Sequence, residues 1–251
     1  MHATNGTNGT DQSSAAMQRW LAGDEAAWGE WLHEHLVAAY GLETEAWASE
    51  RVLRVTERLN RERWGGPPIR AEIVWLQAMT AFAAPGRYVY LSRELLQRLD
   101  SDDAVAFVVA HEMAHHDLGH LRLFTGWWRN RLHAALPSAG ATVVAAMYRA
   151  LEHKLIGPER ERAADTYALD LCIVAGYDPE HCLDVFTALE AHALDLGDLD
   201  IVFGPDEAPG ALPADLRRWG WQRGRGYPSL RQRVALLRAH EEALAATGGV
   251  G

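Results

Sequence analysis

The sequence predicts an α+β fold that is mostly helical and contains a small sheet. Apolar side chains recur at helical spacing over residues 17–63. Two short segments, residues 72–76 and 87–91, have the length and the residue types of strands. Residues 104–110 are apolar on every side of a helix, which predicts a helix that is buried all round.

Turn and cap residues divide the first half of the chain. Gly41 separates two helices, and the Gly-Gly-Pro-Pro run at residues 65–68 ends the second. Pro85-Gly86 turns the chain into the strand at residues 87–91, where side chains alternate between two faces. A short helix at residues 93–99 follows.

The second half of the chain has clearer helix boundaries. Ser101 is a typical N-cap, with acidic residues in the turn that follows it, and it begins the apolar helix. Residues 121–156 have no pattern that predicts their structure. A helix over residues 158–176 has Pro at its first position and Gly at its end. Another helix begins at Asp178-Pro179.

The composition is that of a globular domain with a polar tail. The chain has 251 residues, of which 48% are hydrophobic, enough for a sizeable core. Residues 1–16 are rich in Asn, Thr, Gly and Ser, and we expect them to be disordered. Residues 17–251 are predicted to form one domain, with N-terminal helices in 17–64 and the core with C-terminal helices in 65–251.

Charge and hydropathy exclude several classes of protein. The formal net charge is −10, which argues against a nucleic-acid partner. The polar N-terminus lacks an export signal, and the longest weakly polar run is broken by Pro137 and Gly140. We therefore expect no transmembrane segment and a cytoplasmic location. In that setting Cys172 and Cys182 are predicted to be buried free thiols.

A histidine motif lies in the buried helix. His111-Glu112-Met113-Ala114-His115 has the form H-E-x-x-H. Residues four apart share one face of a helix, so both imidazoles can bind one Zn²⁺. Glu112 stands beside them, where it can take a proton from a zinc-activated water that attacks a carbonyl. Such polar residues in an apolar helix need a strong reason to be buried.

Two later histidines, His116 and His120, are alternatives for the third ligand. The extended zincin pattern places a Gly and a third His at positions that here hold Leu118 and Leu121. If the helix continues, His116 and His120 point away from the face of His111. We expect both to be structural or hydrogen-bonding residues, and a role in supporting a ligand stays open.

Glu161 offers a carboxylate ligand from another helix. Asp165 lies four residues on and shares its face. Glu161 can complete a site of two histidines and one glutamate, while Asp165 accepts the free N–H of a ligand imidazole. Glu159 is a competitor on a different face. The small residues that would let this helix pack closely on another are Ala163, Ala164 and Ala168.

Five separated segments carry motifs that occur together, in this order, in one family. They are Thr80-Ala-Phe-Ala-Ala-Pro-Gly86, residues 106–120 with the ending His-His-x-x-Gly-His, residues 161–165, Gly176-Tyr-Asp-Pro179 and Tyr227-Pro-Ser-Leu-Arg-Gln-Arg233. They resemble the gluzincin metallopeptidases of the HtpX heat-shock protease and CAAX-prenyl-protease family. Together they are far more specific than H-E-x-x-H alone.

The resemblance implies a zincin-like fold, with a small antiparallel or mixed sheet packed on the active-site helix. It also implies one Zn²⁺ per chain and a peptide or protein substrate. The roles that it implies are His111, His115 and Glu161 as metal ligands, Glu112 as general base, Asp165 as support for a ligand, and Tyr88, Val89 and Tyr90 in the edge strand that pairs with an extended peptide.

Three positions depart from the family pattern. Thr80 stands where the family usually has Asn, Arg87 where it often has a second Gly, and Tyr227 where it often has His. A Tyr227 hydroxyl could still donate to the tetrahedral oxyanion, which makes it a candidate catalytic residue beside the alternative of an ordinary core or surface tyrosine. Arg233 is a candidate buried cation near the site. The family's membrane spans have no counterpart, so the resemblance is to a soluble member.

The sequence thus predicts a zinc endopeptidase, and a dedicated processing peptidase is a narrower version of that prediction. The alternative is a non-catalytic zinc-binding or partner-binding protein on the same scaffold. Against it, Glu112 is intact, and a structural zinc normally has four protein ligands. A third interpretation also stays open, in which Trp127, Trp128 and the loosely apolar residues 121–150 dock on a membrane surface.

Overall fold

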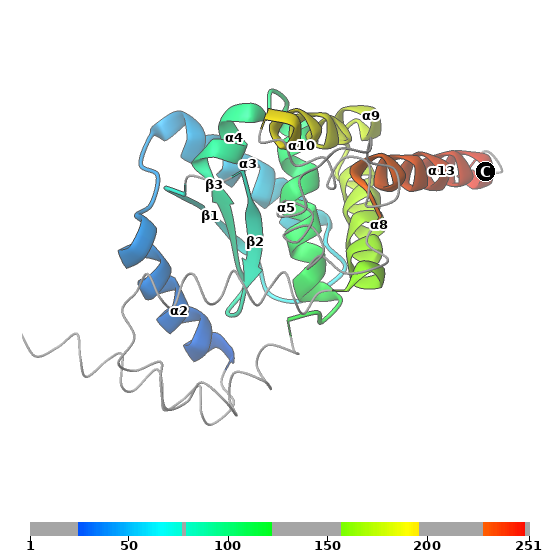
Figure 1. Ribbon diagram of the computed structural model, residues 1–251. Helices are drawn as coiled ribbons and strands as arrows, with labels where there is room; N and C mark the ends of the chain where they lie inside the picture. Colours follow the sequence, from blue (N-terminus) through cyan, green and yellow to red (C-terminus); the bar gives the residue numbers. More distant parts are fainter. Residues whose placement is uncertain (1–24, 77–78, 122–156, 196–227, 249–251) are drawn as a thin grey trace, which may run out of the picture.

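The computed structural model describes residues 25–76, 79–121, 157–195 and 228–248 of the chain (Figure 1). Within these residues the fold is α+β and mostly helical, as the sequence predicts. Its elements are α2 (Glu25–Tyr40), α3 (Ala46–Glu62), β1 (Arg70–Val74), β2 (Ala81–Ala84), β3 (Tyr88–Ser92), α4 (Arg93–Arg98), α5 (Asp102–Asp117), α8 (Pro158–Val174), α9 (Pro179–Cys182), α10 (Asp184–Asp195) and α13 (Leu230–Gly248).

A three-stranded mixed sheet forms one layer of the fold. The strand order is β1-β3-β2, with β1 parallel and β2 antiparallel to β3. β3 therefore has a neighbour on each side, and all five of its residues are buried. The expectation that Tyr88, Val89 and Tyr90 form the edge strand is wrong, because β2 pairs along the second side of β3.

β2 is a strand that the sequence pattern does not predict. Three of its four residues are alanines, which are depleted in strands. It forms through its pairing with β3, in the register Phe82 opposite Tyr90 and Ala84 opposite Tyr88. Among the described residues β2 has one strand neighbour, and it forms the edge of the sheet that lies toward α5 (Figure 1).

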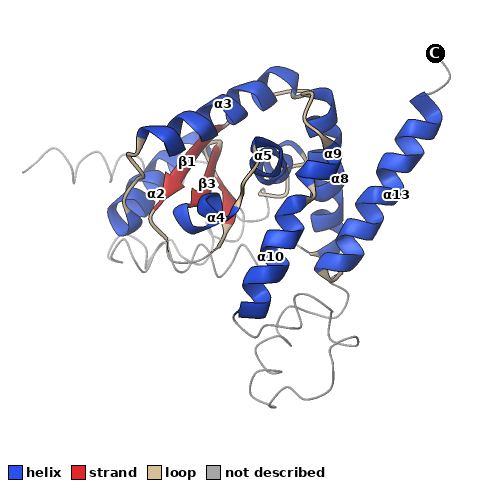
Figure 2. Ribbon diagram, turned by 90° about the horizontal axis from the view of Figure 1, so that it is seen from above, coloured by secondary structure: helices blue, strands red, loops and turns tan. Residues whose placement is uncertain are grey.

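α5 is the buried helix that the sequence predicts. The Ser101 hydroxyl accepts a hydrogen bond from the Ala104 backbone N–H at 3.1 Å and so caps its N-terminus. All residues from Ala104 to Ala110 are buried. The helix packs against the sheet and α3 on one side and against α8 on the other, as the view along α5 in Figure 2 shows. α5 is thus enclosed by the rest of the fold.

α8 packs along α5 through small side chains. The helix begins with Pro158 at its first position, as predicted. Ala164 and Ala168 are fully buried, whereas Ala163 is exposed, so two of the three alanines named from the sequence lie inside the fold. Small side chains allow two helix axes to approach closely.

The turn before β3 holds Arg87 in an unusual backbone conformation. Its φ of 68° lies in the left-handed region that favours glycine. This conformation explains why the resembling family often has glycine at the position. The Arg87 guanidinium donates a hydrogen bond to the carbonyl oxygen of Pro67 at 3.0 Å, a contact that glycine cannot make.

The remaining sequence predictions concern the two cysteines, membrane-spanning helices and segments outside the described residues. Cys172 and Cys182 are buried free thiols, as predicted. In the parts of the chain that the structure describes, no helix is both long and apolar enough to span a bilayer. The predictions for residues 1–16, Trp127 and Trp128 concern positions outside the described residues.

Candidate metal centre

Three predicted metal ligands bring their donor atoms together. The Nε2 atoms of His111 and His115 lie 3.2 Å apart. Glu161 Oε2 lies 3.5 Å from His111 Nε2, and Glu161 Oε1 lies 3.7 Å from His115 Nε2. α5 supplies the imidazoles from consecutive turns, and the first turn of α8 supplies the carboxylate. Among the described residues, His111, His115 and Glu161 form the group of His, Cys, Asp or Glu side chains whose donor atoms lie close enough together to hold a metal ion.

The donor set fits a zinc ion. Tetrahedral zinc with bonds of roughly 2.0–2.1 Å holds its donors about 3.3 Å apart. The two imidazole nitrogens lie 3.2 Å apart, and one donor atom from each of the three residues lies within 4.8 Å of the others. Two imidazoles and one carboxylate are also the protein ligands of one class of catalytic zinc site, which leaves a fourth position for water or substrate.

Asp165 and Arg233 stand behind the His111 imidazole. Asp165 Oδ1 lies 3.0 Å from His111 Nδ1. The Arg233 guanidinium donates to both oxygens of Asp165, from Nε at 2.7 Å and from Nη2 at 2.5 Å. The Asp165 carboxylate thus faces a predicted ligand imidazole, as the sequence predicts, and the Arg233 cation lies near the site with its side chain 19% exposed rather than buried.

His120 and His116 lie in different surroundings. α5 ends before Gly119, whose φ of 71° turns the chain back. His120 Nδ1 therefore lies 2.9 Å from His115 Nδ1, with both rings buried. His116 Nε2 donates to the carbonyl oxygen of Tyr88 at 3.0 Å, which is a structural contact with β3. The expectation that His120 points away from the site is wrong, because it assumed a continuing helix.

Opposite charges stabilise one another among the side chains of this site. Burial lowers the pKa of His111, but Asp165 and Glu161 outweigh burial and raise this pKa to about 10. Burial raises the pKa of both carboxyls, but His111 brings the pKa of Glu161 to about 2, and Arg233 with His111 does the same for Asp165. Burial and His111 lower the pKa of His115 to about 3. Two ionised carboxylates thus favour a cation at the imidazoles.

Glu112 lies beside the donor atoms without being one of them. Its side chain is buried between α5 and β2. Burial and the negative charge of Glu161 raise its pKa, while His111, a backbone hydrogen bond from Ala83 and the charge of Arg233 lower it. The balance raises the pKa to about 7. Such a carboxyl can take up and release a proton near neutral pH.

The sequence profile of Peptidase family M48 matches residues 43–241. The chain belongs to peptidase family M48. This confirms the resemblance and the zincin-like fold that it implies, and with the paired histidines and Glu161 in place the M48 chain is a metallopeptidase. The match includes α5 and α8 and begins after α2. A search among curated proteins finds no match.

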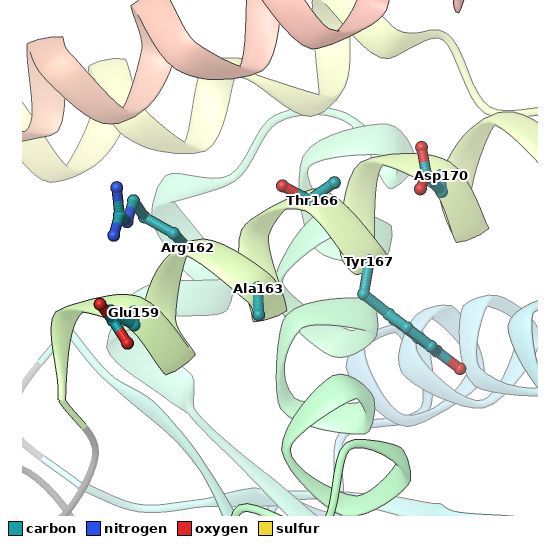
Figure 3. Close-up of a pocket in the computed structure, with 6 residues that line it drawn as sticks. All are labelled: Glu159, Arg162, Ala163, Thr166, Tyr167 and Asp170. Atoms are coloured by element: carbon teal, nitrogen blue, oxygen red, sulfur yellow. The ribbon is translucent and has the colours of Figure 1, made fainter.

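The opposite face of α8 in this M48 peptidase carries a shallow hollow. Figure 3 shows its lining side chains spread along the helix, with Tyr167 pointing toward a neighbouring helix. They are Glu159, Arg162, Ala163, Thr166, Tyr167 and Asp170. Glu159 is exposed there, on a different face from Glu161, so it does not compete to be the third ligand.

Two contacts in this M48 site are not predicted from the sequence. One is the contact of Ala83 in β2 with Glu112, because β2 itself is not predicted. The other is the contact of His120 with His115. Gly119 is the signal for the second, since a glycine directly after a helix is typical of a chain reversal. Tyr227, the candidate oxyanion donor, lies outside the described residues.

Replacing Asp165 by Asn is expected to weaken zinc binding. The Asp165→Asn variant keeps the size of the side chain but removes the negative charge that faces His111 Nδ1. Partners of this kind change metal affinity by roughly 10- to 100-fold. The zinc dissociation constant, measured by competition with a chromophoric chelator, checks the prediction.

Asp170→Asn is the matched control on the same helix. Its carboxylate pairs with His240 at 2.7 Å on the outer side of α8, so zinc affinity is expected to match that of the wild type. If Asp165→Asn and the wild type bind zinc equally well, Asp165 does not support a ligand.

Proposed function

We propose that the protein is a zinc-dependent endopeptidase in which Glu112 is the general base. The observation that carries the proposal is the position of the Glu112 carboxyl, which is buried beside three converging donors. A structural zinc usually has four protein ligands, and the described residues provide three. Two histidines and one glutamate are the protein ligands of one class of catalytic zinc site, which favours catalysis.

The side chains divide the work of hydrolysis. A zinc ion held by His111, His115 and Glu161 would lower the pKa of a coordinated water toward ~7 and polarise the scissile carbonyl. Glu112 accepts the proton of the attacking water and then donates it to the leaving peptide nitrogen. The same carboxyl therefore both takes up the proton and releases it.

The outer edge of β2 is where we place an extended peptide substrate. Ser92 N–H donates to the carbonyl oxygen of Thr80 at 2.9 Å, which sets the alternation of hydrogen bonds between β2 and β3. By that alternation the backbone groups of Ala81 and Ala83 face away from β3. The hydrogen bond of Ala83 with Glu112 agrees with this direction. A peptide added there as a further strand lies next to the general base.

Glu112→Gln tests the general base. The amide has nearly the same shape as the carboxyl but cannot take the proton, so zinc content is expected to stay at one per chain. Cleavage of a labelled unfolded protein should fall by at least about 100-fold. Glu159→Gln, on the outer face of α8, is the control and should cleave at the wild-type rate.

Two results would contradict the proposal. A Glu112→Gln variant that cleaves as fast as the wild type excludes Glu112 as the base. Wild-type protein that holds one zinc per chain and cleaves no unfolded protein favours a non-catalytic zinc-binding protein instead.

Ala81→Pro tests the substrate edge. Proline removes the N–H that faces away from β3 and leaves the β2–β3 hydrogen bonds intact. The loss of one hydrogen bond to substrate is expected to raise KM roughly two- to tenfold with little change in Tm. Ala84→Pro, in which the lost N–H faces β3, should instead lower Tm. An unchanged KM in Ala81→Pro would place the substrate elsewhere.

A further inference from the structure

The end of α5 folds back onto the helix through a Schellman motif. His120 N–H donates to the carbonyl oxygen of His115 at 2.9 Å, and Gly119 N–H donates to that of His116 at 3.1 Å. These are the two hydrogen bonds that define the motif, and Gly119 supplies the left-handed residue that it requires, with a φ of 71°. The motif thereby holds the backbone of His120 against that of His115.

The side chains of the same two residues also meet. In a Schellman motif the second residue after the cap commonly makes an apolar contact with the last turn of the helix. Here that contact is polar, with His115 Nδ1 and His120 Nδ1 2.9 Å apart. The two residues are 2% and 8% exposed, so little solvent reaches the contact. His115 is thus held by both the backbone and the ring of His120.

The direction of the ring-to-ring hydrogen bond follows from the position of the metal site. One of the two Nδ1 atoms must donate and the other must accept. His115 Nε2 faces His111 and Glu161, at 3.2 and 3.7 Å, and a metal-binding nitrogen carries no proton. The ring proton of a neutral His115 is then on Nδ1, which makes His120 Nδ1 the acceptor.

We propose that His120 is a positioning residue for metal binding, which accepts the Nδ1–H of His115 and so fixes the tautomer and orientation of that ligand. This role rests on the proposed zinc site. It gives the two ligand imidazoles different partners, since His111 faces the carboxylate of Asp165 whereas His115 faces a neutral ring. A neutral partner orients His115 without adding a further negative charge to the site.

Two substitutions separate the acceptor from the bulk of the side chain. In His120→Asn the amide oxygen can take the place of Nδ1, whereas His120→Leu has no acceptor. Zinc dissociation constants are measured by competition with a chromophoric chelator, on the full chain. We expect His120→Leu to bind zinc roughly 10- to 100-fold more weakly and His120→Asn to stay close to the wild type.

His116→Leu is the matched control from the same turn. It removes a partly buried hydrogen bond of similar length, to Tyr88 rather than to a ligand, so it should leave the zinc affinity unchanged. Thermal unfolding of each variant in excess chelator gives its stability without metal. A purely structural role of His120 lowers that stability in His120→Leu and leaves the zinc affinity of the folded protein at the wild-type value.

The proposed tautomer of His115 can also be tested on the wild-type protein, so that the result does not depend on the folding of a variant. In ¹⁵N-histidine NMR spectra of the zinc-loaded protein, His115 is expected as the Nδ1–H tautomer. A coupling across the hydrogen bond to Nδ1 of His120 is expected with it. A proton on Nδ1 of His120 would overturn the proposal, as would wild-type zinc affinity in His120→Leu or equal losses in His120→Leu and His120→Asn. Wild-type protein that takes up no zinc overturns the metal site itself, and this role with it.

Discussion

The contact between α5 and α8 determines whether a metal site can exist in this fold. His111 and His115 share a face through the local geometry of one helix, but Glu161 reaches them only because α8 packs against α5. Ala164 and Ala168 are fully buried on α8, and their small side chains allow a short distance between the axes of α5 and α8. Larger side chains there would separate the helix axes and move the carboxylate away from the imidazoles.

Ion pairs offset the cost of burying charged side chains between α5 and α8. Both oxygens of Asp165 are held by Arg233, while Glu161 faces the two imidazoles. Burial lowers the pKa of His111, but Asp165 and Glu161 raise it to about 10. A metal ion and a proton compete for the same nitrogen, so the field that holds the proton also favours the cation. The same groups therefore prepare the site for zinc.

The metal ligands could be predicted because their arrangement depends on helical spacing, which is local, and on motifs in a characteristic order. The first residues of α5 and α8 could also be predicted, since Ser101 and Pro158 are strong local signals for the start of a helix. β2 could not be predicted from the sequence, because an alanine-rich strand forms through its pairing with β3 and not through the strand preference of its own residues. The same long-range pairing makes β3 central and β2 the edge. For His120, the direction of the side chain depends on where α5 ends, and Gly119 decides that.

Anomalous diffraction at the zinc edge, from crystals of the zinc-loaded full chain, tests the central claim most directly. The account predicts one anomalous peak per chain, bonded to Nε2 of His111, Nε2 of His115 and the carboxylate of Glu161, with water or a bound ligand in the fourth position. A peak held by other side chains, a fourth protein ligand on the same ion, or no peak at this site would contradict it.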